Sequence, residues 1–334
     1  MKTFAIDLKP ESDFATELAG DCLFGQICWQ LAQDESLAGE LSDLLKDYDT
    51  RPFLVVSDPV ISFINKGQKE YLMKRPFVPS AEKPFANLAY EEQKKLFTER
   101  KRRKGCRWVI VSDSKILNPL DPDSPVNIQD IVNRYNLPED WSPEKTYYQT
   151  HNSIDRLTGT TGTDAAFAPF NQMLISWPND LKLTLFFGIS EKIKIEAVKT
   201  ALLRIGVTGY GADASTGKGR FSFVEIKEID IQKFGSKNPD SLYTLGSSLP
   251  VPQIYRQICF EPTVRFGKHG NILATGDYPF KQPVLKASSG SVFKPLKDYW
   301  PEKPFIGSSI KGLSMLPETV EQGYSLFIPV KSEV

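Results

Sequence analysis

The chain has 334 residues, which is enough for two packed domains or for one domain with large insertions. Its 41 basic residues equal its 41 acidic residues, so there is no global attraction for nucleic acid or membranes, and such a site would need local clustering of charge. No apolar run approaches the roughly 20 residues of a membrane span, and the start lacks a signal-peptide pattern. We therefore expect a soluble protein of the cytoplasm.

Cysteine and histidine are too few and too irregularly spaced for a metal site or a disulfide framework. The chain contains Cys22, Cys28, Cys106, Cys259, His151 and His269. The cysteines form no C-x-x-C pair, and the two histidines lie far apart in the sequence. We expect free thiols in a reducing compartment, with no metal and no cofactor.

The first sixty residues predict a strand, a helix and a second strand. Residues 1–8 alternate apolar and polar side chains, and residues 51–61 form the second strand region. Asp21 is positioned to cap the intervening helix. Gly25 inside that helix costs about 1 kcal/mol relative to alanine, so we expect close packing in the core or, as the alternative, close approach of RNA. Strand, helix, strand is the first half of a ferredoxin-like β-α-β-β-α-β unit.

A large insertion, about residues 65–150, interrupts this unit. Residues 65–80 predict a loop or small subdomain, residues 108–112 a strand, and residues 118–143 an irregular connection rich in Pro, Asp and Asn. The basic run 91–107 holds eight basic and three acidic residues. Such a run forms a solvated helix face or, as the strongest electrostatic candidate in a neutral protein, contacts phosphates. The residues that we select here as candidate RNA contacts are Arg102 and Arg103.

Residues 151–163 combine polar and charged side chains with glycine and threonine. His151 and Asp155 lie four apart and would share one face of a helix, which would suit a catalytic or metal site. The glycines and threonines favour instead an extended hairpin that lies against RNA or a neighbouring subunit. Asn152 and Arg156 are the candidate RNA contacts, and an ion pair with Asp155 is an equal alternative for Arg156.

The next segments predict the second half of the unit. Residues 173–177 and 181–187 alternate as paired strands, with a Pro-Asn-Asp turn between them. A helix follows, capped by Ser190 and ending near Gly206, and a further strand begins at Phe221. This count gives one strand more than the unit needs, and we leave open which strand lies outside it.

Between that helix and strand lies the glycine loop, residues 206–220, with the sequence G-V-T-G-Y-G-A-D-A-S-T-G-K-G-R. Such a density of glycine indicates a loop shaped for a ligand. A Rossmann loop follows a strand and opens a helix, and a Walker loop has Ser or Thr after its lysine, so both are excluded. A glycine-rich hairpin without a ligand is the alternative. The candidate RNA contacts are Gly209, Gly211, Gly217, Lys218, Gly219 and Arg220.

The last hundred residues predict strands only. Residues 235–252 carry Gly, Ser, Asn and Pro and mark a domain boundary. Short β-like runs follow at 254–260, 284–286, 291–293 and 324–330. We expect an α+β chain, with a ferredoxin-like domain over residues 1–234 and a second, mostly β, degenerate ferredoxin-like domain over residues 253–334.

Four stretches together resemble a known family. They are G-Y-G-A-D-A-S-T-G-K-G-R-F (209–221), G-D-C-L-F-G-Q-I-C (20–28), H-N-S-I-D-R-L-T-G (151–159) and Q-G-Y-S-L-F-I-P (322–329). The first is similar to the glycine-rich loop of the RAMP superfamily, the RNA-binding proteins of CRISPR systems. The others resemble segments of the fourth subunit of the type III-A Csm effector complex, and they are spread over most of the chain.

The resemblance implies a RAMP fold and a binding role without chemistry. A subunit of this kind grips the 5′ repeat-derived tag of the crRNA and caps the backbone filament. It also joins the large polymerase-like subunit to the repeated RAMP backbone subunit. Loop amides with Lys218 and Arg220 would contact phosphates. The alternatives are a guide-processing endoribonuclease, with His151 as its candidate base, and a purely structural subunit that never touches RNA.

Overall fold

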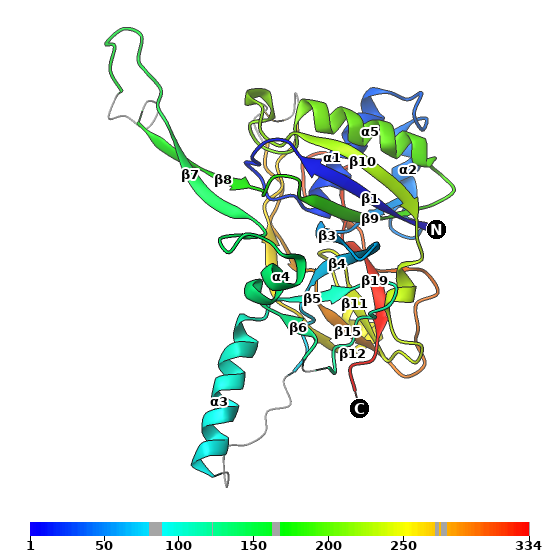
Figure 1. Cartoon of the computed structure of the whole chain (residues 1–334). Helices are drawn as coiled ribbons and strands as arrows, with labels where there is room; N and C mark the ends of the chain where they lie inside the picture. Colours follow the sequence, from blue (N-terminus) through cyan, green and yellow to red (C-terminus); the bar gives the residue numbers. More distant parts are fainter. Residues whose placement is uncertain (80–88, 122, 162–167, 271–273, 275–278, 334) are drawn as a thin grey trace.

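Two antiparallel sheets form the body of the molecule, and a helix and a hairpin project from it (Figure 1). The computed structural model describes residues 1–79, 89–121, 123–161, 168–270, 274 and 279–333. The chain is a mixed α/β protein in which strands predominate. Within these described ranges, no helix is long and apolar enough to cross a membrane.

The first sheet is built around the central pair β1 and β9. Its strands follow the order β10-β1-β9-β3-β4-β5-β6, and β2 pairs with β9 beside β3. The bounds of the strands that carry the fold are β1 (Lys2–Pro10), β2 (Leu54–Val56), β3 (Val60–Asn65), β9 (Lys182–Ile189) and β10 (Phe221–Glu228). Alternation brings Ile6 opposite Leu185 and Leu8 opposite Leu183, and all four are buried. The first strand is thus confirmed, whereas the second strand region is divided near Pro59, which cannot donate a backbone hydrogen bond.

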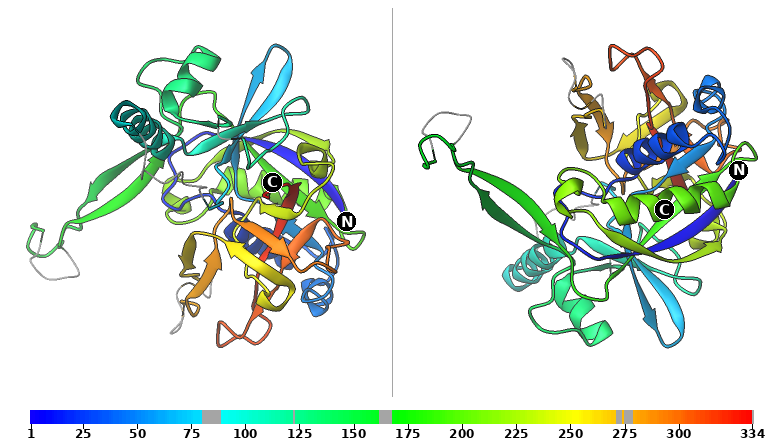
Figure 2. Two further views of the ribbon diagram at one scale, coloured as in Figure 1. Left: turned by 90° about the horizontal axis from the view of Figure 1, so that it is seen from below. Right: turned by 90° about the horizontal axis from the view of Figure 1, so that it is seen from above.

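Helices α1 (Gly20–Gln33) and α5 (Ile195–Thr208) pack on each other and cover one face of this sheet, with α2 (Leu41–Lys46) beside them (Figures 1 and 2). The sequence misplaced both ends of α5. Its N-cap is Lys194, while the Ser190 hydroxyl accepts a hydrogen bond from the Lys192 amide at 3.2 Å. The helix also continues past Gly206. A Cβ there would lie 2.2 Å from the carbonyl oxygen of Phe221, so this glycine permits close packing of α5 on β10.

Helix α1 corrects two further predictions. Its N-cap is Ala19, and Asp21 lies inside the first turn with its carboxylate buried in ion pairs. Core packing does not explain Gly25, because a Cβ there would meet nothing within 4 Å. Close approach occurs instead at Gly20, where a Cβ would lie 2.4 Å from the carbonyl oxygen of Val56.

The insertion extends the first sheet and adds two helices. Its elements are β4 (Gln68–Lys74), α3 (Tyr90–Gly105), β5 (Trp108–Val111), β6 (Pro125–Val126) and α4 (Ile128–Tyr135). The predicted strand at 108–112 is confirmed. The predicted loop 65–80 is wrong because it contains β4, joined to β3 by a tight turn with Lys66 and Gly67 both at positive φ. The predicted irregular connection 118–143 contains α4, a helix too short to stand out by periodicity.

A two-stranded hairpin, β7 (Lys145–His151) with β8 (Phe170–Ser176), projects far from the body (Figure 1). The predicted pairing of residues 173–177 with 181–187 is wrong. Strand β8 pairs with β7, whereas β9 enters the first sheet between β1 and β3. Strand β8 therefore lies outside the first sheet.

The second sheet has five strands in the order β12-β15-β11-β19-β16. They are β11 (Ser241–Thr244), β12 (Tyr255–Cys259), β15 (Val292–Pro295), β16 (Phe305–Gly307) and β19 (Tyr324–Val330). Two small hairpins accompany them, β13 (Pro262–Arg265) with β14 (Val284–Ala287), and β17 (Ile310–Lys311) with β18 (Val320–Glu321). The four predicted β-like runs all fall on strands. Because β11 lies inside the segment 235–252, this sheet begins before Pro252.

Buried charges tie the second half of the chain to the first. Lys286 of β14 is fully buried, and its Nζ donates to Asp21 Oδ2 of α1 at 2.9 Å and lies 2.5 Å from Glu321 Oε1. Burial raises the pKa of Asp21, but the charges of Lys286 and Arg265 outweigh it and hold that pKa below its usual value. Asp21 is therefore part of the joint between the two halves of the chain, and not a helix cap.

Candidate nucleic-acid interface

The glycine loop connects α5 to β10, which is the order of helix, loop and strand that the sequence predicts. Gly209, Gly211, Gly217 and Gly219 all have positive φ, between 72° and 103°. A Cβ added at three of them, Gly209, Gly211 or Gly219, would lie 2.0 to 2.6 Å from a neighbouring atom. These three glycines therefore serve the shape of the loop itself. Gly217 differs, because a Cβ there would meet nothing within 4 Å.

Residues 11–19, between β1 and α1, hold the loop in place. The Gly219 amide donates to the Asp13 carbonyl at 2.8 Å, and the Ala212 amide donates to Thr16 Oγ1 at 2.9 Å. Sequence reasoning missed this segment, because its signal is the pairing of β1 with β10, which local patterns do not show. Since β1 and β10 are antiparallel neighbours, the residues that follow β1 must meet those that precede β10 at one edge of the sheet.

Tyr210 anchors the loop to the start of α1. Its side chain is fully buried, with its ring centroid 5.9 Å from that of Phe14. Its hydroxyl donates to the Glu17 carbonyl at 3.0 Å and accepts from the Ala19 amide at 3.1 Å. Burial raises the pKa of Tyr210 well above its usual value, so the hydroxyl remains a donor. The loop is therefore a fixed part of the body.

The two cations of the loop differ in their surroundings. Lys218 Nζ lies 3.7 Å from Asp13 Oδ2, and the same carboxylate oxygen accepts a hydrogen bond from the Tyr147 hydroxyl of β7 at 2.6 Å. That hydrogen bond raises the pKa of Tyr147. Arg220 is exposed and makes no ion pair with any other residue that the structure describes. Asp13 thus offsets part of the charge of Lys218, and Arg220 carries the unopposed charge.

Most backbone amides of the loop are already occupied. The amides that already donate a hydrogen bond to an acceptor within the protein include those of Gly209, Tyr210, Ala212, Thr216, Gly217, Lys218 and Gly219. An anion at this loop would therefore meet the side chains of Lys218 and Arg220 more readily than the row of amides that the sequence suggested. Gly217 provides the open surface beside them.

The hairpin residues do not join the glycine loop. Tyr147 near the base of β7 reaches Asp13, but His151 ends β7, and Asn152 and Arg156 follow it towards the tip of the projecting arm (Figure 1). The His151 ring stacks on Phe170, with centroids 5.4 Å apart and planes 16° apart. No helix forms in the described residues 151–161, which agrees with the prediction of an extended segment rather than a helix. The last two residues of that prediction, Gly162 and Thr163, lie outside the described residues.

The alternative partner of Arg156 is not observed. Asp155 Oδ1 accepts a hydrogen bond from the Leu157 amide at 2.8 Å, and no ion pair links Asp155 to Arg156. Among the described residues, no group of three or more His, Cys, Asp or Glu residues is placed to hold a metal ion. All four cysteines are free.

Arg102 and Arg103 lie in the last turn of α3, at the end attached to the body. Arg102 Nη2 lies 3.8 Å from Asp123 Oδ1, and Arg103 Nη2 lies 3.9 Å from Glu99 Oε2. The Arg103 carbonyl also accepts a hydrogen bond from Arg75 Nη1 at 2.8 Å. Both predicted contacts thus have protein partners, while α3 as a whole projects from the body and contains no buried residue.

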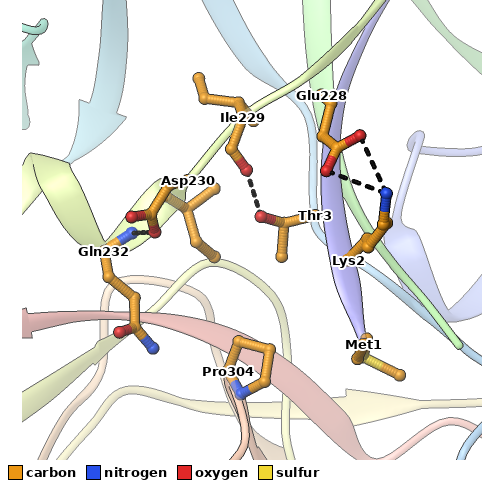
Figure 3. Close-up of a pocket in the computed structure, with 9 residues that line it drawn as sticks. Met1, Lys2, Thr3, Glu228, Ile229, Asp230, Gln232 and Pro304 are labelled. Carbon is orange, nitrogen blue, oxygen red and sulfur yellow. Dashed lines mark hydrogen bonds and ion pairs between the residues drawn. The ribbon is translucent and has the colours of Figure 1, made fainter.

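A surface cavity of about 380 Å³ lies at the other end of β1 and β10 from the glycine loop (Figure 3). Several of its polar groups are paired with one another (Figure 3). Lys2 Nζ lies 3.4 Å from Glu228 Oε1, and the Thr3 hydroxyl donates to the carbonyl of Ile229. We assign this cavity no ligand.

No protein-family model matches the sequence, and no curated protein matches it. Solved structures share its fold, and the chains that it resembles are those of Csm4. For the Csm3-Csm4 subcomplex of the type III-A CRISPR-Cas interference complex, the TM-score is 0.56 at 15% identity, over 98% of this chain and 99% of that chain. For the Csm1-Csm4 cassette with AMPPNP, it is 0.53 at 14% identity, over 100% and 99%. For the cassette with cA4, it is 0.52 at 13% identity, over 100% of both chains. At this identity the likeness is one of fold.

Proposed function

We propose that this chain is the crRNA-holding subunit of a type III CRISPR effector complex, acting in the cytoplasm. The observation that carries the proposal is the full-length likeness to Csm4, in structures that contain Csm1 or Csm3 as the second protein. In this role the chain grips the 5′ repeat-derived tag of the crRNA and caps the backbone filament. It contacts the large polymerase-like subunit on one side and the repeated RAMP backbone subunit on the other.

We infer that β1, α1, β2, β9, α5 and β10 form a ferredoxin-like unit. The order β10-β1-β9-β2 of its strands supports this inference, as do the two helices on one face (Figure 2). The strands β3 to β6, α3, α4 and the projecting hairpin are then additions to the unit. The five-stranded second sheet is its degenerate partner, and no α-helix follows α5 in the part of the chain that the structure describes.

The RNA grip that we propose uses side chains at an open surface. Arg220 and Lys218 supply charge for phosphates, and Gly217 leaves the surface beside them clear of a side chain. Arriving phosphate would compete with Asp13 for Lys218. The loop is held by residues 11–19, so its shape exists before RNA arrives, and no ordering of the loop opposes binding.

The test compares two glycines that both have positive φ and open space where a Cβ would lie. Gly217→Val places a branched side chain on the proposed RNA surface, at φ +91°. The control Gly39→Val places the same side chain in open space outside that surface, between α1 and α2, at φ +75°. We expect Gly217→Val to lower the affinity for tagged RNA at least tenfold, and Lys218→Ala to lower it by less. The affinity of Gly39→Val should equal that of the parent protein. Titrations with tagged and untagged crRNA measure this, and thermal melting confirms folding. Equal binding by folded Gly217→Val and the parent would remove the loop from the RNA site.

We propose that this role requires no chemistry. The candidate base of the endoribonuclease alternative, His151, stacks on Phe170 on the projecting hairpin, away from the glycine loop. His151→Ala should therefore leave crRNA maturation intact in cells. Accumulation of unprocessed precursor with this substitution alone would favour the nuclease. Purification of the native complex, followed by identification of its proteins and RNA, tests the assembly itself.

A further inference from the structure

Helix α3 stands out because it meets the body at its C-terminal end, where Arg75 contacts Arg103 and Asp123 contacts Arg102. It runs for 16 residues, none of them buried, and projects downwards from the body in Figure 1, whereas the β7–β8 hairpin projects to the upper left. Isolated helices shorter than about 12–15 residues are marginal in water, and most helices in proteins depend on tertiary packing. Because α3 lacks such packing within the described chain, we expect one of its faces to bind a partner outside the chain.

One face of α3 carries a regular stripe of exposed side chains. Tyr90, Lys94, Phe97, Lys101 and Lys104 follow one another at spacings of four and three residues, which places all five on the same face. All five are exposed, Tyr90 by 75% and Phe97 by 65%. The stripe is about 21 Å long at 1.5 Å per residue. Two aromatic rings thus alternate with lysines along a straight surface.

The lysines of this stripe are electrostatically unpaired. None of the three forms an ion pair with any residue that the structure describes, in contrast to Arg102 and Arg103 on the other faces. A protein helix with the same spacing would have to bury these ammonium groups in a coiled-coil seam, which is costly without acidic partners. Single-stranded nucleic acid suits the stripe better, because aromatic rings stack on bases while cations meet the phosphates.

We propose that the Tyr90–Lys104 stripe of α3 is a second RNA-binding site, which takes single-stranded RNA without reading its sequence. Bases stack on Tyr90 and Phe97, and the three lysines contact the backbone. The site rests on the proposed function only in that both require RNA. It is separate from the glycine loop, and it replaces Arg102 and Arg103 as the contact surface of the basic run.

The test uses the full chain and a fluorescent oligouridine of about 20 nucleotides, which lacks any tag. Lys101→Glu changes the stripe, and Lys95→Glu makes the same charge change on the same helix outside the stripe. We expect Lys101→Glu to weaken binding about tenfold at low salt and to lower the salt slope by about 0.7 for each phosphate that the lysine no longer neutralises. Lys95→Glu should change affinity by less than twofold. Phe97→Ala should weaken binding about fivefold or more because a base loses its stacking partner, with a nearly unchanged salt slope.

The outcomes separate this proposal from the function of the glycine loop. Loss of oligouridine binding in Lys101→Glu with intact tag discrimination supports the stripe, whatever the Gly217→Val result. If Lys101→Glu and Lys95→Glu lowered the affinity for oligouridine equally, α3 would attract RNA only through its overall positive charge, and the proposed site would be overturned. Normal RNA binding by Phe97→Ala and Lys101→Glu, with loss of a protein subunit from the purified complex, would overturn it in favour of a protein contact. Circular dichroism confirms that each variant retains its helix content.

Discussion

The glycine loop and α3 are the two places where we connect this chain with RNA, and they are built in opposite ways. The loop is pinned by residues 11–19, by the buried Tyr210 and by three glycines that have no room for a Cβ. Helix α3 has no buried residue, and all five side chains of its stripe are exposed. Substitutions at the three packed glycines therefore disturb folding and binding together, whereas substitutions at Gly217 or on α3 report mainly on binding. Measurements of stability test this difference.

The largest effect is expected in the joint beneath the loop. Lys286→Met would leave the buried carboxylates of Asp21 and Glu321 without their shared cation, and should cost about 3–5 kcal/mol of unfolding free energy. The matched change on α3, Lys101→Met, should cost less than about 0.5 kcal/mol. Urea denaturation of both variants measures the difference. Similar losses would mean that α3 is as much a part of the folded body as the joint is.

A smaller contrast is expected inside the loop. Gly219→Ala places a Cβ 2.0 Å from the Tyr210 carbonyl at φ +72°, and should cost about 3 kcal/mol through overlap and backbone strain. Gly217→Ala meets no neighbour and should cost about 1 kcal/mol from its φ alone. Midpoints of denaturant unfolding compare the pair. If Gly217→Ala proved the more damaging, the loop would not be packed as described.

Acid should weaken the body through Glu70. Burial raises the pKa of this carboxyl, but hydrogen bonds from Arg134 and Tyr135 outweigh it and lower the pKa to about 2. A folded-state pKa below the ordinary value stabilises the protein above pH 4.5, and this stabilisation is lost as the pH falls from 4.5 towards 2. Glu70→Gln should therefore cost about 2 kcal/mol at pH 7 and progressively less below pH 4.5. A gap between the two proteins that stayed constant down to pH 3 would contradict this assignment.

The smallest effect is expected on α3. Phe97→Ala removes a ring that contacts no described core residue, so the unfolding free energy should change by less than about 0.5 kcal/mol. Thermal and denaturant unfolding check this value. A loss above about 1 kcal/mol would show that the ring packs within the protein and is not free for a ligand.

The sequence by itself determined those features whose signals are local. Alternation placed β1, a short β-like run placed β19, and the charge of the basic run suggested the solvated helix α3 as one of two alternatives. Flanking patterns placed the glycine loop between a helix and a strand. The exposed stripe on α3 also depends on helical spacing alone, once the helix is known. Each of these signals depends only on residues that are close together in the sequence, so it can be recognised without the fold.

Tertiary structure alone decided how distant segments meet. Strand β8 alternates as well as β9 does, so only the folded chain shows that it pairs with β7. From the sequence, the glycines of the loop indicate contacts with a ligand, with a glycine-rich hairpin without a ligand as the alternative. The choice falls on packing at Gly219, because Tyr210 and Asp13 lie against it from other turns of the chain. Likewise, only the folded chain shows that His151 lies at the end of β7, on the hairpin that projects from the body (Figure 1). Pairing and close approach depend on atoms far apart in the sequence, and local patterns carry no information on them.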